Sequence, residues 1–215
     1  MRHCKDLSHS GLFLLAITLA GTLMAGCASA SSKGEKRVQG FAKTREVLDD
    51  SAAQVDATIL AMNRLRGAPA GLGETFARYK KAVEQLEKQG ADAKWQAQAM
   101  KEQSDEHIRA WQEEMSSITD PKIKASLQSR RDAVKTNFAL VQMYIDDVRK
   151  AYGPFLSGNT QMVQALSIDL SPATVSSLSE VMDRVTTDGV TLKQKIGLMQ
   201  HALNNIANGL SPIGL

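Results

Sequence analysis

Cysteine and aromatic residues are scarce in this sequence. Among 215 residues there are two cysteines, Cys4 and Cys27, and aromatic residues make up 5%. If the N-terminal segment is removed on export, Cys27 alone remains and no disulfide can form within the chain. The fold must then rest on packing. So few aromatic residues are typical of long helices that meet along narrow seams rather than of a compact α/β enzyme.

The chain also lacks a strong charge of either sign. It has 26 lysines and arginines against 23 acidic residues, a formal net charge of +3, and the two signs are interspersed. Proteins that bind nucleic acids concentrate lysine and arginine on one face. We therefore expect no nucleic-acid partner. The hydrophobic content of 43% is enough for a core.

Motifs for catalysis, nucleotide binding or metal binding are missing as well. The sequence contains no G-x-S-x-G, no P-loop and no G-x-G-x-x-G. Only His107 and His201 would remain after export, and neither has an acidic residue three or four positions before it. The Glu-x-x-His pairs of di-iron bundles are therefore absent. We predict no enzyme activity, no metal site, no cofactor and no small-molecule substrate.

The N-terminal apolar stretch is too short to cross a membrane. It covers residues 11–24, about 14 residues, whereas a transmembrane helix needs about 20. It follows a basic start and ends in L-M-A-G-C at Cys27. This order predicts a signal peptide over residues 1–26. Small residues directly before a cysteine resemble the lipobox of bacterial lipoproteins, so we expect Cys27 to be the lipidation site.

Two destinations are compatible with this signal. Acyl chains on Cys27 would hold the protein on a membrane, and Ala28 in place of aspartate after the cysteine favours the periplasmic face of the outer membrane. Alternatively, A-S-A at residues 28–30 is a site for ordinary signal peptidase, and cleavage after Ala30 would release the protein into the periplasm. Residues 28–34 are small and polar, so 27–34 are expected to be the lipidated cysteine and a flexible tether.

Heptad spacing of apolar residues is the main feature of the mature chain, and residues 35–66 should form a first helix. Arg45 falls on its apolar seam. If this seam is buried, the charge of Arg45 would set the register of the helices or the choice of partner. If the helix instead packs through another stripe, which includes Val47 and Leu60, Arg45 is exposed. Gly67 to Gly71, with Pro69 between them, ends the pattern. The seam positions share alternating spacings of three and four: Val38, Phe41, Arg45, Leu48, Ala52, Val55, Ile59, Met62 and Arg66.

Three further helical stretches follow. The second helix should cover about 74–118. The third should begin at Pro121, which Asp120 can cap. Gly153-Pro154 interrupts it, and because the apolar pattern resumes at Phe155 a kinked continuation is an alternative to a stop. The last should begin after a second cap and proline, Ser171-Pro172, and close near Gly209. The fold class is therefore all-α: an elongated antiparallel bundle or coiled-coil-like hairpin of three to four long helices over 35–210, with 211–215 as a loose tail.

The pattern resembles a known family, the bacterial lipoproteins grouped as domain of unknown function 2959. W-Q-E-E-M beginning at Trp111 is similar to the family's W-Q-x-E-L, and 123–131 to its L-R-x-x-S segment. P-F-L beginning at Pro154, with the apolar residues after it, matches the spacing of a P-V-L run. Residues 166–171 read L-S-I-D-L-S where the family usually has L-K-H-N-L-N. The resemblance implies a long helical lipoprotein and no defined activity.

Two functions of different class fit these observations. The first is a structural or interaction protein: a lipid-anchored rod that scaffolds or spaces envelope components, with a protein partner or self-association through its helical seams. The second is a helical module that binds a lipid or another hydrophobic ligand in the periplasm. Seven of the nine methionines lie in the mature helices, where they would suit an adaptable apolar groove. A filled seam favours the scaffold, and an exposed apolar groove favours the binding module.

Overall fold

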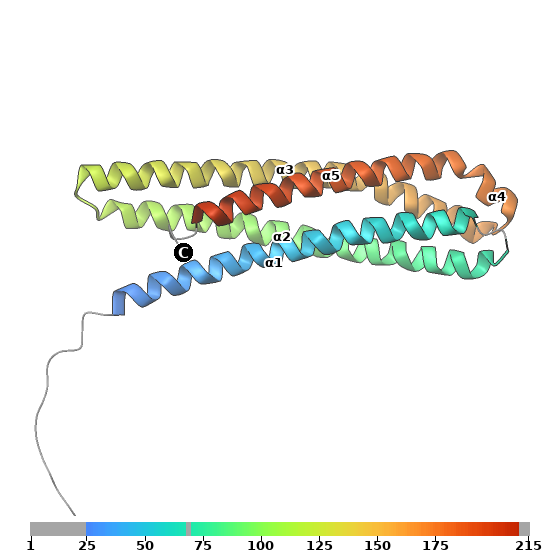
Figure 1. Ribbon diagram of the computed structural model, residues 1–215, viewed down its shortest axis with the longest axis horizontal. Coiled ribbons are helices and arrows are strands. Elements are labelled where there is room, and N and C mark those ends of the chain that lie inside the picture. Colours follow the sequence, from blue (N-terminus) through green and yellow to red (C-terminus); the bar gives the residue numbers. More distant parts are fainter. Residues whose placement is uncertain (1–24, 68–69, 211–215) are drawn as a thin grey trace, which may run out of the picture.

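The described part of the chain is entirely helical. The structure is a computed structural model that describes residues 25–67 and 70–210, with side chains for 43–67 and 70–207. The helices are α1 (Ala25–Gly67), α2 (Leu72–Ser116), α3 (Pro121–Ile168), the short α4 (Pro172–Ser177) and α5 (Ser179–Leu210), and this part contains no strand (Figure 1). The predicted all-α class is confirmed, with four long helices.

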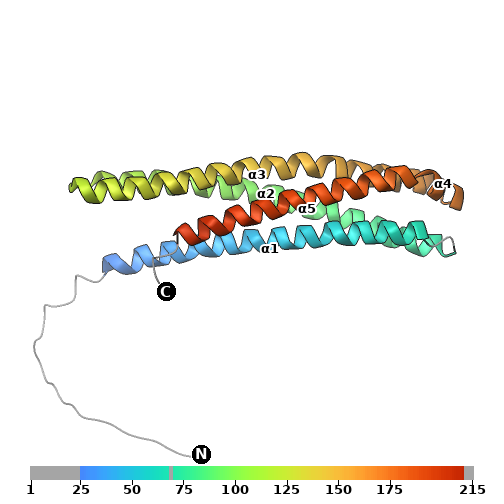
Figure 2. The same cartoon turned by 45° about the horizontal axis from the view of Figure 1, so that its top comes forward.

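The long helices form an elongated antiparallel bundle. α1 packs against α2 and α5, and α3 packs against the same two helices, so the four occupy the corners of the bundle. α3 has 48 residues, which corresponds to a length of about 72 Å. The hairpin of α2 and α3 continues beyond the end of α5, and the first half of α1 diverges from the other helices (Figures 1 and 2).

The predicted seams form the core. In α5 the apolar residues at heptad spacing are all buried: Met182, Val185, Leu192, Ile196, Met199, Leu203 and Ile206. Most of the corresponding residues of α2 and α3 are buried or half-buried. Ile123 is an exception with 54% exposure, because it lies at the end of the hairpin that α5 does not reach. The largest fully buried side chains come from four helices: Tyr79, Phe155, Met62, Leu65, Met162, Leu166, Met182, Leu192, Leu203, Ile206, Val55 and Val141.

α1 differs most from the expectation. It begins at Ala25 rather than near residue 35, so 28–34, expected as a flexible tether, lie within the helix. Alanine is the best helix former, and extending an existing helix avoids the cost of nucleation. Arg45 is exposed, because the buried stripe of α1 begins with Thr44 and Leu48 instead. Of the two residues named for a different stripe, Val47 is half-buried and Leu60 is 51% exposed.

Both helix starts that were predicted from a capping residue followed by proline are confirmed. The Asp120 carboxylate accepts hydrogen bonds from the backbone N–H of Lys122 (2.8 Å) and of Ile123 (3.0 Å), and Pro121 is the first residue of α3. The Ser171 hydroxyl accepts from the N–H of Thr174 (3.2 Å) at the start of α4. α3 runs through Pro154 without ending. The expected last helix is divided between α4 and α5.

Candidate functional site

The predicted lipidation site lies at one end of the bundle. Cys27 belongs to the first turn of α1, but its side chain lies outside the described side chains, as do residues 1–24 of the expected signal peptide. The start of α1 and the turn between α2 and α3 lie at the same end of the molecule (Figure 1). The end of α1, the start of α2 and the short α4 lie at the opposite end. No described helix has a stretch that is both long and apolar enough to cross a membrane.

His107 lies in an aromatic cluster of the hairpin. Its ring centre is 5.5 Å from that of Trp111 and 6.5 Å from that of Phe138, the latter in an edge-to-face arrangement. The imidazole is half-buried between α2 and α3. Within the described residues, no three His, Cys, Asp or Glu side chains lie close enough together to hold a metal ion. The packing of His107 is that of a seam residue.

A buried polar pair joins α2 to α3. The Tyr79 hydroxyl donates to Asn159 Oδ1 (2.8 Å), and Asn159 Nδ2 donates to the Phe155 carbonyl oxygen (2.7 Å). Both Tyr79 and Asn159 are 0% exposed. Burial raises the pKa of the Tyr79 phenol well above its ordinary value of 10.0. The hydroxyl therefore stays protonated and serves as a structural donor.

A second polar pair joins α1 to α2. Gln54 Nε2 donates to the Ala82 carbonyl oxygen (2.8 Å), and the Thr58 hydroxyl donates to the Gln54 carbonyl oxygen (2.8 Å). Thr58 is 0% exposed. Because unpaired polar groups are costly in a core, such pairs restrict the two helices to one register. Sequence patterns did not single out these residues, although Asn159 and Thr58 occupy seam-like positions beside Phe155 and Val55.

The hollow between α1 and α2 is polar. It has a volume of about 380 Å³. The Gln89 Oε1 atom is buried there and has no hydrogen-bond partner in the structure. Carboxylates, amides and an amine dominate the lining: Val47, Asp50, Ser51, Gln54, Gln85, Lys88, Gln89 and Asp92. Such a lining suits water or a small polar molecule, and it is a poor match for a lipid.

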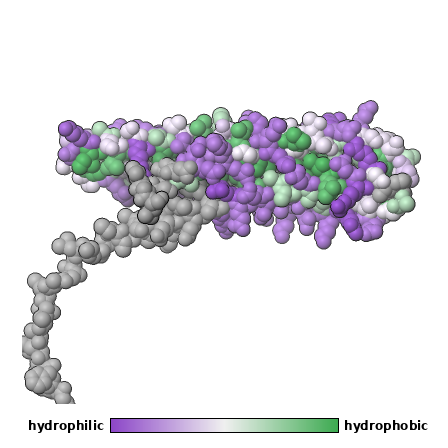
Figure 3. Space-filling model, in the orientation of Figure 1, coloured by the Kyte–Doolittle hydropathy of each residue, from purple (hydrophilic) through white to green (hydrophobic). Residues whose placement is uncertain are grey.

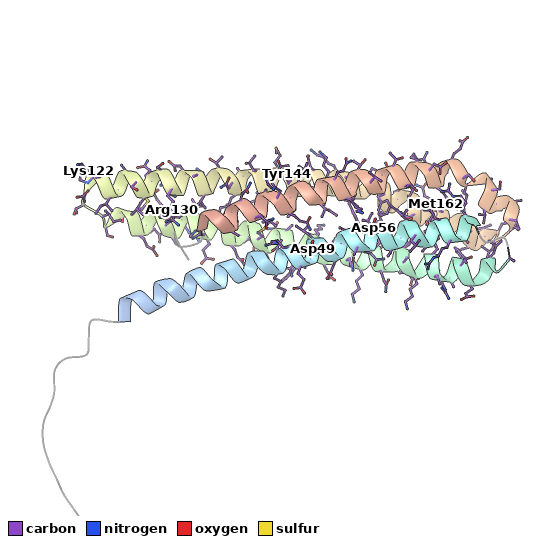
Figure 4. The ribbon with its side chains drawn as sticks, in the orientation of Figure 1. Asp49, Asp56, Lys122, Arg130, Tyr144 and Met162 are labelled. Atoms are coloured by element: carbon purple, nitrogen blue, oxygen red, sulfur yellow. The ribbon has the colours of Figure 1, made fainter. Side chains whose placement is uncertain are left out.

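Ion pairs hold α5 against its two neighbours. Lys193 pairs with Asp56 of α1 (2.6 Å), and Asp183 pairs with Arg66 of α1 (2.5 Å). Lys195 pairs with Asp147 of α3 (3.0 Å). In Figure 4 Asp56 is labelled where α1 runs beside α5. All of these side chains are partly exposed, so each pair adds little stability, on the order of 0–1 kcal/mol.

The basic cluster of α3 is partly neutralised. The sequence contains Arg130, Arg131 and Lys135 close together, and Arg131 pairs with Asp132 at 2.6 Å. Lys135 is exposed. Arg130 lies near the hairpin end of the bundle (Figure 4). This arrangement is that of an ordinary solvated helix surface rather than a cluster of free positive charges.

Exposed apolar residues occur at the end of α3 and in the turn that follows, within the stretch that departs from the family's usual sequence. Ile168, the last residue of α3, is 88% exposed, and Leu170, between α3 and α4, is 37% exposed. Asp169, between them, accepts hydrogen bonds from the hydroxyls of Ser171 and Thr174. Elsewhere, the face in Figure 3 is mostly hydrophilic, with separate hydrophobic residues rather than one continuous apolar patch.

Comparison with known protein families matches residues 29–209 with the family described as "Protein of unknown function (DUF2959)". The match begins in the second turn of α1 and ends in the last turn of α5, so it includes all of the helices. No curated protein matches the chain, and no solved structure matches it either. The long helical bundle agrees with the fold that the resemblance implied. The chain belongs to the DUF2959 family of proteins of unknown function.

Proposed function

We propose that this protein is a lipid-anchored helical rod that scaffolds or spaces components of the bacterial envelope. In this proposal Cys27 carries the lipid, the outer membrane holds the protein at its periplasmic face, and the bundle projects from it. The protein has no enzymatic role, cofactor or small-molecule substrate. The observation that carries the proposal is the filled interior of a bundle about 70 Å long.

The filled interior supports a scaffold over a carrier of hydrophobic ligands. The large apolar side chains of α2, α3 and α5 pack against one another, and the hollow beside α1 is lined mainly by polar groups. A carrier needs an apolar pocket that buries most of its ligand. We expect a fluorescent fatty acid to bind the purified protein no better than it binds a protein without such a pocket. Saturable binding with one ligand per chain would favour the carrier instead.

The filled interior also limits where a partner could bind. Helical seams were one expected route to self-association, but in the described residues these seams are filled by helices of the same chain. We therefore propose that partners contact the outer surface or an end of the rod. Cross-linking of intact cells followed by purification of the protein should recover a defined set of envelope proteins. Recovery of the free protein alone would contradict a scaffold.

The anchor has a direct test with a matched control. Cys27→Ser removes the acylation site, so the variant should move from the membrane fraction to the soluble periplasmic fraction. Cys4→Ser changes a cysteine that the proposed cleavage removes, so it should leave fractionation unchanged. Labelling with alkyne-palmitate should follow the same pattern. If the Cys27→Ser variant stays in the membrane fraction and the wild type takes up no label, the lipid anchor is excluded.

A further inference from the structure

We infer that the tip of the α2–α3 hairpin binds the surface of the membrane that holds the lipid on Cys27. In this contact Ile123 enters the headgroup layer, and the lysines on either side of it meet anionic phosphates. The tip consists of residues 117–124, from the end of α2 to the first turn of α3. The inference rests on the proposed lipid anchor, and it adds how the rod is oriented on the membrane.

The position of the anchor determines what the tip faces. The start of α1, which contains Cys27, lies at the same end of the bundle as the hairpin turn (Figure 1). The hairpin continues beyond the end of α5, so the tip protrudes, and Lys122 lies at the extreme end of the rod (Figures 2 and 4). A membrane that holds Cys27 is therefore within reach of the tip. A second copy in the same membrane would stand beside the first, so both tips would face the lipid and not each other.

The tip presents one apolar side chain between two cations. Ile123 is 54% exposed, and Lys122 and Lys124 are exposed as well. Neither lysine forms an ion pair with another residue of the described part of the chain. This combination suits the boundary between headgroups and acyl chains, because the apolar group is removed from water there while the amines stay beside anionic phosphates.

Acidic residues do not cancel the charge of the two lysines at the tip. Asp120 is the only acidic residue among 117–124. Its carboxylate accepts hydrogen bonds from the backbone N–H of Lys122 (2.8 Å) and of Ile123 (3.0 Å), so it is engaged by the start of α3. Glu113 and Glu114 belong to the last turn of α2, behind the tip. The outermost residues of the hairpin therefore offer two free amines and one engaged carboxylate.

The opposite end of the rod lacks this combination. Ile168 is 88% exposed there, but its neighbour is Asp169, and residues 167–179 contain no lysine or arginine. An exposed apolar residue beside a carboxylate is a poor match for an anionic surface. The two ends thus differ in the charge that accompanies an exposed isoleucine, and Ile168 serves as a matched control for Ile123.

The contact at the tip depends on the anchor. A lysine near an anionic membrane strengthens binding by about fivefold. Two lysines and one isoleucine are too few to hold a free protein on a membrane. The lipid on Cys27 keeps the tip close to the surface, however, so the contact re-forms without diffusion through solution. Two points of attachment would hold the rod upright, which is the orientation that a spacer needs.

Quenching by a spin-labelled lipid tests the inference on the full lipidated chain. Once the signal peptide is removed and Cys27 is acylated, Ile123→Cys supplies a single free thiol for a fluorescent label. Ile168→Cys supplies the control label at the other end. Both proteins are reconstituted into vesicles of phosphatidylethanolamine and anionic phosphatidylglycerol that contain the spin-labelled lipid, which quenches fluorophores at the bilayer. We expect quenching at position 123 to be at least fivefold stronger than at position 168.

Charge reversal shows whether the lysines are responsible. Lys122→Glu together with Lys124→Glu should reduce the quenching at position 123 at least fivefold, and vesicles of neutral phosphatidylcholine should have the same effect on the original charges. Lys80→Glu together with Lys81→Glu is the control, because these two exposed lysines of α2 lie far from the tip. The control should change the quenching less than twofold. Melting temperatures equal to that of the wild type establish that the variants are folded.

The possible results separate the tip from the anchor. Equal quenching at both positions, as expected for a rod that lies flat, overturns the inference, and so does quenching that survives charge reversal. If the chain takes up alkyne-palmitate but position 123 is not quenched, the anchor stands and only the contact at the tip is wrong. If the chain takes up no palmitate, the anchor and the inference fail together.

Discussion

At the scale of single residues, glycines determine how closely the helices approach. A Cβ atom at Gly90 would lie 2.1 Å from the Tyr152 hydroxyl oxygen, so the phenol occupies the space that a side chain would take. That hydroxyl donates to the Leu86 carbonyl oxygen (3.0 Å). Gly189 has the same role in α5, where a Cβ would lie 2.7 Å from Ile59 and 2.8 Å from Phe155. The helices meet closely because these positions lack side chains.

Gly90→Ala should therefore destabilise the protein. Alanine in place of glycine within a helix normally stabilises it by about 1 kcal/mol. Here Tyr152 must move and lose its hydrogen bond, so we expect a net loss of about 1–2 kcal/mol in the free energy of unfolding. Gly197→Ala is the control, because a Cβ there meets nothing within 4 Å, and it should stabilise by about 0.5–1 kcal/mol. Urea unfolding measures both, and equal shifts would contradict the close approach at Gly90.

Tyr79→Phe tests the buried pair between α2 and α3. The change leaves Asn159 Oδ1 buried without its donor, which costs about 1–3 kcal/mol. The control is Tyr144→Phe, since the half-buried Tyr144 has no hydroxyl hydrogen bond among the described residues. Urea unfolding of both variants gives the comparison. A loss from Tyr144→Phe as large as that from Tyr79→Phe would mean that the Asn159 contact is not responsible.

The two buried phenols also make stability depend on pH. Burial, together with the nearby Glu87 carboxylate, raises the pKa of Tyr152 to about 12, and burial alone raises that of Tyr79. Both phenols are protonated below pH 10 in the folded and unfolded states, so the stabilisation is complete there. Above pH 10 the unfolded chain ionises first, and stability is lost as pH rises toward 12. Unfolding curves from pH 9 to 12 should therefore show a smaller decline for Tyr79→Phe than for the wild type.

At the scale of secondary structure, the helix ends are fixed by local chemistry. Asp120 and Ser171 each cap a helix whose first residue is proline, and both hydrogen-bonding patterns are present. Proline suits this position because no N–H is needed there. The start of α1 is not fixed in this way: no cap signal precedes Ala25 in the sequence, and the helix extends into the small residues before 35.

Asp120→Ala should lower the stability of the protein by about 0.5–2 kcal/mol, because two backbone N–H groups lose their acceptor. Asp120→Gly should cost only a few tenths of a kcal/mol by the same rule. Thermal melts followed by circular dichroism distinguish the two. If glycine proved as damaging as alanine, the carboxylate would have a role beyond capping α3.

At the scale of the whole molecule, the bundle is a rod with two different ends. One end holds the start of α1 and the charged turn of the α2–α3 hairpin, and the other holds the end of α1, the start of α2 and α4 (Figure 1). The hairpin end is the thinner one, since α5 ends before the hairpin of α2 and α3 does. Its length would separate an anchor at Cys27 from the far end by about 60–70 Å.

Small-angle X-ray scattering tests this shape in solution. A compact domain of this length should have a radius of gyration of about 17 Å. A rod about 70 Å long must exceed 20 Å, because its mass is spread along one axis. The measurement is combined with light scattering, so that the mass of a single chain is established. A monomer with a radius near 17 Å would contradict the extended bundle.

Much of this fold was predictable from local patterns. The heptad spacing in α2, α3 and α5 identifies residues that are buried, because a helix with one apolar stripe has to cover it against another helix. The turns at Asp120-Pro121 and Ser171-Pro172 follow from side chains that bind their own backbone. The absence of strand patterns identified the all-α class. These features depend on residues within one or two turns of each other, so the sequence alone determined them.

Contacts between distant residues were not predictable in this way. The pairing of Tyr79 with Asn159, the insertion of Tyr152 at Gly90 and the exposure of Arg45 depend on how four helices are rotated and shifted against one another. A helix with one apolar face can pack against its neighbours at several rotations and shifts, and only the assembled core selects one of them. The exposure of Ile168 was decided at the same level: in sequence it resembles any apolar residue near a helix end, and only the tertiary structure leaves it without a neighbour to cover it.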